Sequence, residues 1–221
     1  MQRPRKNLSQ REAVLIITNG EQEENYFKSL TRSFRSIYKI EVVRQKQNIS
    51  KMVEFAISGK AEREYNMVWC VFDIDEQFKE GHLTQDVVAL ARKNGISLAY
   101  SNEAFEVWLM FHFEESVKRI KRTQYDKEMT RLIKKHTGKD IQDYKSAKTD
   151  VELLRKHFVP KAREAATRAK ISYQRRVLEH EGLSGRKGCF PFWLWTSTTN
   201  VFNLVERLML TEKFECEDAR E

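Results

Sequence analysis

A short apolar run that ends in two closely spaced aspartates constrains the fold of this chain more than any other feature. Residues 67–72 read Met-Val-Trp-Cys-Val-Phe, and Asp73 and Asp75 follow directly. The run is too short to cross a membrane and too apolar for an exposed face, so it predicts a buried β-strand. Because side chains alternate along a strand, the two carboxylates are expected on one side if strand geometry persists to residue 75.

Two carboxylates at the end of a buried strand predict a site for a divalent metal ion, because hard cations prefer oxygen ligands. The alternative is turn formation, since aspartate at a strand end also forms hydrogen bonds with the nearby backbone. The spacing of Asp73 and Asp75 alone does not separate these two interpretations.

The first hundred residues predict alternating strands and helices. The predicted elements are strands at residues 13–18, 38–43, 67–72 and 96–100 and helices at residues 21–35, 50–63 and 83–93. This order is typical of an α/β fold, in which helices cover both faces of a parallel sheet. Ligands of such sheets bind in the loops at the carboxyl ends of the strands.

Polar residues gather at this predicted edge of the sheet. The candidate site residues are Asn19, Glu21, Glu24, Asp73, Asp75, Asn102 and Glu106. Glu106 lies in an apolar segment, residues 101–113, which predicts a helix. A glutamate in such a segment needs a basic side chain or a metal ion as partner. The alternative is that it interacts with the positive end of the helix dipole or forms an exposed salt bridge.

The second half of the chain predicts a basic, mainly helical lobe. Residues 117–187 contain 21 Lys or Arg and 9 Asp or Glu, whereas the remainder contains 19 basic and 23 acidic residues. A basic segment beside an acidic core predicts a surface for a polyanion, although a helical lobe with solvated lysine faces is the alternative. The candidate nucleic-acid-binding residues are Lys145, Lys148, Arg175, Arg176, Arg186 and Lys187.

The predicted organisation is a core and a lobe with loose ends. Residues 13–113 are expected to form the metal-binding core, and residues 114–210 a basic helical lobe that packs back on it. Helices in this lobe are predicted at residues 124–136, 146–158, 162–180 and 201–210. Residues 1–12 and 211–221 are expected to be loose.

Composition excludes several classes of protein. The chain has no continuous apolar stretch of ~20 residues, so no membrane span or signal peptide is expected. Its three cysteines form no C-x-x-C pair, which is typical of the reducing cytoplasm. The five histidines are scattered and show no H-E-x-x-H pattern, so a zinc site is not expected.

Four motifs together resemble the RloB-like family, a branch of the Toprim group. They are Asn19-Gly20-Glu21-x-x-Glu24-x-Tyr26-Phe27, Phe72-Asp73-x-Asp75, Ser101-Asn102-x-x-Phe105-Glu106-x-Trp108 and Ser197-Thr198-x-x-Val201. The resemblance covers about residues 13–210 and implies a Toprim-like core that cleaves phosphodiester bonds with Mg²⁺ or Mn²⁺. It also implies a bacterial anti-phage, abortive-infection role beside an ABC-type or AAA-type ATPase.

By motif position, Asp73 and Asp75 match the family's metal-holding aspartates, with Glu24 and Glu106 as further matching acids. Toprim proteins generally have a glutamate where this chain has Asn19, and an asparagine exchanges no proton near neutral pH. Glu21 lies two residues on and is a candidate substitute.

Two hypotheses of function follow. The leading one is a cytoplasmic, metal-dependent nuclease that acts on RNA, including tRNA, or on DNA. The alternative is a non-catalytic nucleic-acid-binding or regulatory subunit of an ATPase-containing defence complex. Nucleotidyl or phosphoryl transfer on the same core is a third possibility, but the chain has no Walker-type phosphate loop.

Overall fold

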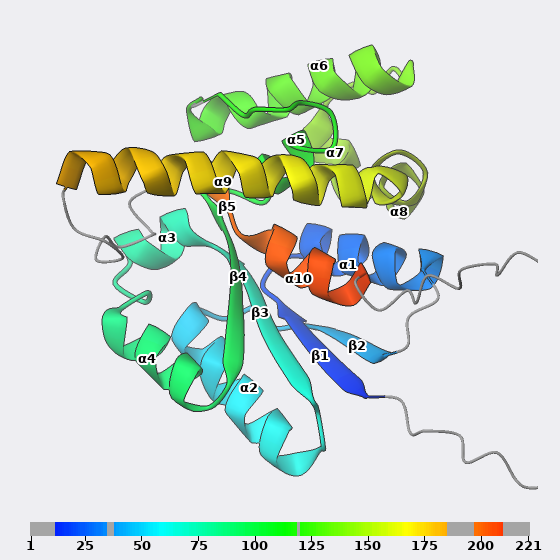
Figure 1. The fold of residues 1–221 in the computed structure, drawn as a ribbon. Helices are drawn as coiled ribbons and strands as arrows, with labels where there is room; N and C mark the ends of the chain where they lie inside the picture. Colours follow the sequence, from blue (N-terminus) through cyan, green and yellow to red (C-terminus); the bar gives the residue numbers. More distant parts are fainter. Residues whose placement is uncertain (1–11, 35–37, 119, 185–196, 210–221) are drawn as a thin grey trace, which may run out of the picture.

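In the part of the chain that the structure describes, five strands form one sheet in the order β2-β1-β3-β4-β5 (Figure 1). The computed structural model describes residues 12–34, 38–118, 120–184 and 197–209. Strands β1 to β4 run parallel, and β5 pairs antiparallel with β4. The strands are β1 Ala13–Thr18, β2 Lys39–Arg44, β3 Met67–Asp73, β4 Ile96–Asn102 and β5 Thr198–Thr199. The predicted parallel sheet is therefore confirmed, whereas β5 is an addition to it.

Helices separate the parallel strands and then make up most of the second half. The helices are α1 Glu21–Ser33, α2 Ile49–Glu62, α3 Ile74–Lys79, α4 Gln85–Lys93, α5 Glu106–Met110, α6 Tyr125–Thr137, α7 Tyr144–Ala147, α8 Val151–Leu153, α9 Ala162–Ser184 and α10 Val201–Met209. Short turns of 3-10 helix lie at Arg122–Gln124 and Val159–Lys161, and a π-helical turn lies at Leu154–Phe158. No helix among the described residues is long and apolar enough to span a membrane.

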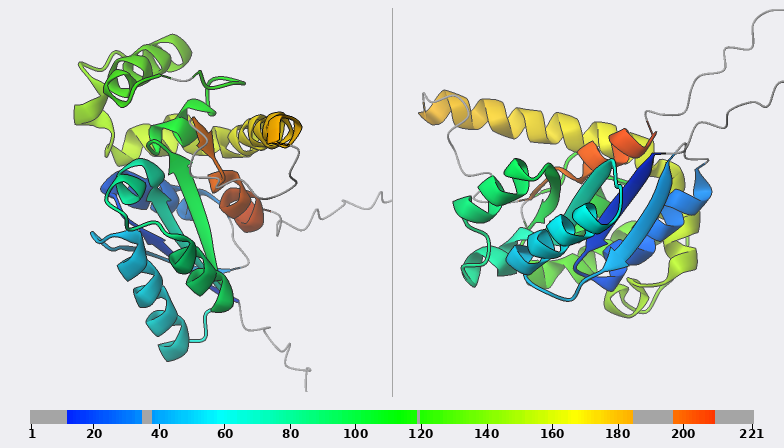
Figure 2. Two further views of the ribbon diagram at one scale, coloured as in Figure 1. Left: turned by 90° about the vertical axis from the view of Figure 1, so that its left-hand side faces the viewer. Right: turned by 90° about the horizontal axis from the view of Figure 1, so that it is seen from below.

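Successive residues of β1 face opposite sides of the sheet, as a strand buried on both faces requires. Val14 and Ile16 belong to the apolar cluster that contains residues of α1, α9 and α10. Leu15 and Ile17 belong to a second cluster with residues of α2 and α4. Figure 2 shows α2 and α4 on one side of the strands and α9 and α10 on the other. The predicted α/β class, with helices on both faces and a mainly helical second half, is confirmed.

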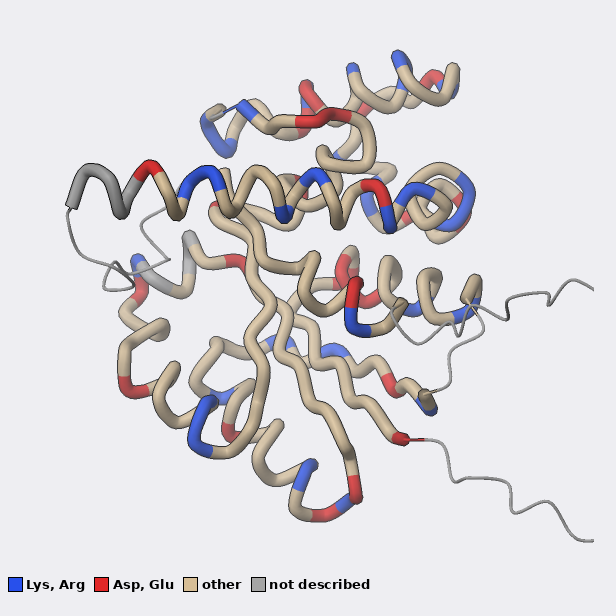
Figure 3. The backbone as a smooth tube through the Cα atoms, viewed as in Figure 1, with Lys and Arg blue, Asp and Glu red and all other residues tan. Residues whose placement is uncertain are grey.

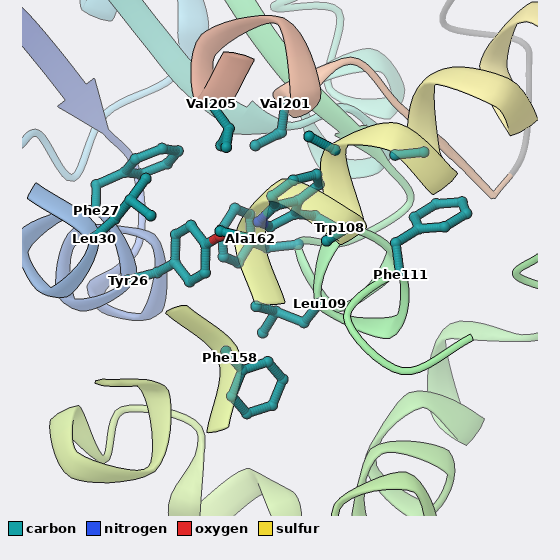
Figure 4. Packing of buried hydrophobic residues seen from close by; sticks show 14 of the residues in the cluster. Tyr26, Phe27, Leu30, Trp108, Leu109, Phe111, Phe158, Ala162, Val201 and Val205 are labelled. Carbon is teal, nitrogen blue, oxygen red and sulfur yellow. The ribbon is translucent and has the colours of Figure 1, made fainter. Parts of the chain in front are cut away.

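The larger cluster joins the sheet to the helices of the second half. Tyr26 of α1 packs edge-on against Trp108 of α5, with ring centroids 6.1 Å apart. Phe158 packs against the His112 ring at 5.5 Å, and all four of these side chains are at most 1 % exposed. Figure 4 shows Tyr26, Trp108 and Phe158 in this cluster together with Val201 of α10. One continuous apolar cluster therefore crosses the predicted boundary at residue 113, and the division into core and lobe stays a prediction.

Two predicted helices are wrong in their extent. The segment at 146–158 is divided into α7, α8 and the π-helical turn, because the side chains of Asp143 and Asp150 each accept backbone N–H bonds that start a new helix. The segment at 101–113 starts instead as strand, because β4 pairs with β5 as far as Asn102. Only the short α5 follows, with its first residue at Glu106.

Candidate functional site

A pocket of about 690 Å³ lies at the carboxyl edge of the sheet. Its floor comes from the ends of the parallel strands and the segments that follow them, through Asn19, Gly20, Asp73, Ala104 and Glu106. The other wall comes from residues 122–149 of the helical second half. Figure 1 shows α6 and α7 above the strand ends, with α7 beside α5 in this view. The pocket therefore lies where the predicted core and lobe meet.

Hydrogen bonds attach this upper wall to the floor. The Gln22 Nε2 of α1 donates to the hydroxyl of Tyr144, which lies 122 residues away in the sequence. The Asn25 Nδ2 donates to the carbonyl oxygen of Thr149 at 2.9 Å. The hydroxyl of Tyr125 donates to Glu103 Oε2 at 3.2 Å. We call residues 122–149 the roof, because these bonds hold them over the sheet edge.

Glu23 is the buried carboxylate of the pocket, with 5 % of its surface exposed. Burial raises its pKa from 4.5 to about 7, because the charged form loses hydration. The backbone N–H of Glu23 lowers this pKa, the negative charge of Glu106 raises it, and the positive charge of Lys148 lowers it. Floor and roof charges therefore both act on this side chain.

Gly20 makes room for Glu23 at the start of α1. A Cβ added at residue 20 would lie 3.0 Å from Glu23 Cδ and would overlap Oε2. The backbone of Gly20 is extended and needs no left-handed conformation, so the requirement for glycine here is one of space. Glu23 was not among the sequence candidates; its position three residues after Asn-Gly, in the first turn of a helix, is the local signal for it.

The two acids predicted on α1 bind basic side chains instead. Glu24 lies 2.7 Å from Lys28 Nζ and 3.2 Å from Arg44 Nε, and it does not line the pocket. Glu21 lines the pocket, but its Oε2 accepts a hydrogen bond from Arg44 at 2.7 Å. The structure thus places Glu23, and not Glu24, on the pocket side of α1.

Asp73 lies where the sequence predicts, at the carboxyl end of β3, and is half-buried in the floor of the pocket. The strand ends there, and α3 begins at Ile74, so Asp75 lies in the first turn of a helix. The premise of a strand that continues to residue 75 is therefore wrong, because the buried Ile74 already belongs to the helix. The side chain of Asp75 lies outside the described residues.

The remaining floor residues differ in position. Asn19 lines the pocket directly after β1, and Glu106 lines it from the first residue of α5. Asn102 is 4 % exposed and pairs with Thr198 in the sheet, away from the lining of the pocket. Of the predicted site residues with described side chains, the structure gathers Asn19, Glu21, Asp73 and Glu106 around one space.

The basic candidates divide into two groups. Lys145 and Lys148 line the pocket from the roof, where Arg122, which sequence reasoning did not select, joins them. Arg175 and Arg176 lie on α9, outside the lining, and Arg176 is 3.3 Å from Glu179. Figure 3 shows basic residues spread along α6 and α9. Arg186 and Lys187 lie outside the described residues.

The carboxylate oxygens at the floor of the pocket are ligands of the kind that a hard divalent cation prefers. Mg²⁺ is commonly bound through one or two carboxylates, with water and substrate phosphates as the other ligands. Among the side chains that the structure describes, no three His, Cys, Asp or Glu residues form a cluster that could hold a metal. Asp73, which lines the floor of the pocket, fits this smaller set together with water. A cation would also offset the repulsion between Glu106 and Glu23 that contributes to the raised pKa of Glu23.

Comparison with known proteins identifies a family. A family model described as RloB-like protein matches residues 14–208. Neither the curated proteins nor the solved structures contain a match.

Proposed function

The chain belongs to the RloB-like family, and we propose that it cleaves phosphodiester bonds of RNA or DNA with a divalent cation. The observation that supports this proposal is the pocket, in which carboxylates of the sheet edge face cations of the roof. Metal-dependent cleavage of nucleic acid uses both, since acids hold the metal and basic residues attract the polyanion.

Asp73 and Asp75 would hold the cation, either Mg²⁺ or Mn²⁺. When bound, such a cation stabilises the negative charge on the attacking and leaving oxygens of the phosphodiester. Glu106 and Glu23 line the same space and add negative charge around it. Lys145, with the remaining roof cations, would bind the phosphates of the strand on either side of the reacting bond.

Asn19 favours a second candidate function. It lines the pocket at the end of β1, where its amide can accept or donate hydrogen bonds but exchanges no proton near neutral pH. A protein that binds nucleic acid without cleaving it, as a regulatory subunit, would keep this pocket and its cations. The two candidates differ in whether Asp73 and Asp75 serve a reaction.

A cleavage assay distinguishes the nuclease from the non-catalytic binding subunit. The purified full chain is incubated with tRNA, single-stranded RNA and plasmid DNA in Mg²⁺, in Mn²⁺ and in chelator. A nuclease cleaves at least one substrate, and both chelator and the double variant Asp73→Ala/Asp75→Ala abolish the cleavage. The control variant Glu54→Ala/Asp86→Ala removes two exposed carboxylates of α2 and α4 and should retain it.

Calorimetric titration with Mn²⁺ gives a readout that does not depend on turnover. The wild-type protein should bind the ion, and Asp73→Ala/Asp75→Ala should not. Equal behaviour of the wild type and this double variant in both experiments would refute the nuclease and leave the binding subunit.

Family association also points to a bacterial anti-phage defence role beside an ABC-type or AAA-type ATPase. Size-exclusion chromatography of this protein mixed with the ATPase, at micromolar concentration, tests whether the two form a complex. Co-elution supports a stable complex, and separate elution, repeated with ATP present, contradicts it.

A further inference from the structure

The pocket is enclosed from two sides. Its floor is the sheet edge, and its second wall is the roof, which three hydrogen bonds tie to α1 and to the segment after β4. Tyr144 and Tyr125, which make two of these bonds, are only 1 % and 3 % exposed, so the roof is packed into the protein. A ligand must therefore enter the space between floor and roof; it does not lie across an open face.

The volume of the pocket matches a small part of a polynucleotide. Pockets of ~300–1,000 Å³ enclose small-molecule ligands, and about 690 Å³ falls within this range. A duplex carries its phosphates on a stiff, wide cylinder, with a second strand beside each of them. Because three hydrogen bonds hold the roof in place, we expect that such a cylinder does not bring a phosphate beside Asp73. A strand that has left its duplex can do so.

Among the described residues that line the pocket, the basic side chains suit phosphates, and the two tyrosines offer no ring face to a base. Arg122 and Lys145 are exposed and Lys148 is half-buried, so three cations face the space from the roof. The rings of Tyr125 and Tyr144 are buried, and their hydroxyls bind Glu103 and Gln22. They therefore present no open ring face on which a base could stack.

We infer that the pocket receives an unpaired strand of nucleic acid, which it holds by its phosphates without preference for the base. This inference rests on the proposed function and specifies its substrate: single-stranded ends, loops or bulges of RNA or DNA. A paired site would be reached only after local unpairing, which costs free energy.

Fluorescence anisotropy tests the inference with the full chain in Ca²⁺, which allows binding to be measured separately from cleavage. The probes are a labelled 12-nucleotide strand as RNA and as DNA, its blunt duplex, and a hairpin with the same sequence in the loop. The strand and the hairpin should bind at least tenfold more tightly than the duplex. Strands of U, A or C should bind within threefold of one another.

Two double variants locate the contact. Lys145→Gln/Lys148→Gln should weaken strand binding at least tenfold. Loss of two phosphate contacts on a single strand should also lower the slope of log affinity against log salt by about 1.4. The control Lys127→Gln/Lys156→Gln removes two exposed lysines that lie outside the pocket and should leave both values unchanged. Circular dichroism melts confirm that both variants fold.

The outcomes are distinguishable. Equal affinity for the duplex and the strand, both dependent on Lys145 and Lys148, would overturn the inference and leave the proposed function intact. A tenfold preference for one base would overturn the recognition by phosphate alone. If the folded protein binds no probe, RNA or DNA, the proposed function itself fails.

Discussion

Replacing Glu23 with glutamine should stabilise the protein at neutral and alkaline pH. Glutamine has the same shape, and its amide oxygen can still accept the backbone N–H that the carboxylate accepts. It carries no charge, so it avoids both the desolvation of a buried carboxylate and the repulsion from Glu106. A substitution at a polar pocket residue is then expected to increase stability.

The sign and size follow from the two protonation equilibria. The pKa of Glu23 is raised in the folded protein to about 7 from its ordinary 4.5, so the folded state binds this proton more tightly. Wild-type stability is therefore lost as pH rises through this window. At about 1.4 kcal/mol per pH unit, the loss reaches about 3 kcal/mol at pH 8 and less than about 1 kcal/mol at pH 5. The Glu23→Gln variant lacks this ionisable group and should not show this loss of stability.

Urea denaturation of both proteins at pH 5 and pH 8, in chelator, measures this difference. A gain of about 3 kcal/mol corresponds to a melting temperature about 6–12 °C higher in a chain of this size. Glu24→Gln is the matched control, since Glu24 forms ion pairs with Lys28 and Arg44. It should lower stability, because two partly buried ion pairs lose their negative partner. A Glu23→Gln variant no more stable than wild type at pH 8, or one with the same gain at both pH values, would refute the reasoning.

Three further predictions concern buried residues of the sheet edge and the larger apolar cluster. Gly20→Ala should lower the free energy of unfolding by about 1–3 kcal/mol, because the added methyl group overlaps the Glu23 carboxylate. A double-mutant cycle with Glu23→Ala should show a smaller loss for Gly20→Ala when residue 23 is already alanine. Phe158→Ala should cost about 3–5 kcal/mol in urea denaturation because the ring is fully buried, whereas the 43 % exposed Val151→Ala should change little; equal effects would contradict the packing. Burial lowers the pKa of the His112 imidazole to about 3, so NMR should show a neutral ring from pH 8 to pH 5. The free energy of unfolding should fall as pH drops from 6.5 towards 3, because the unfolded state takes up the proton first. Protonation of the folded protein near pH 6.5 would contradict the burial of this ring.

The sheet and the position of Asp73 follow from local patterns. A strand buried on both faces needs a continuous apolar run, and such runs are visible in residues 13–18 and 67–72 without any knowledge of their neighbours. Parallel connection then brings the ends of these runs to one edge, so Asn19 and Asp73 were predictable as neighbours. The family resemblance, confirmed over residues 14–208, rests on motifs that contain the same positions.

The start of α3 shows where local patterns stop being sufficient. The alternation of side chains predicts Asp75 beside Asp73 only while the strand lasts, and the chain turns into a helix at Ile74. Ile74 is apolar and buried, as a residue of a continued buried strand would also be expected to be. Hydrophobicity therefore does not reveal the change.

The choice between Glu23 and Glu24 depends on tertiary structure. Both acids lie in the first turn of α1, and about 100° of helix separates them. Which of them faces the pocket depends on how α1 is rotated against the sheet, and a hydrogen bond from Gln22 to Tyr144, across 122 residues, helps to hold that rotation. The amino-acid order thus specifies a sheet edge that carries acids, because strand burial is a local property. Which acids enter the pocket, and which lysines face them, depends on contacts between distant segments that no local pattern contains.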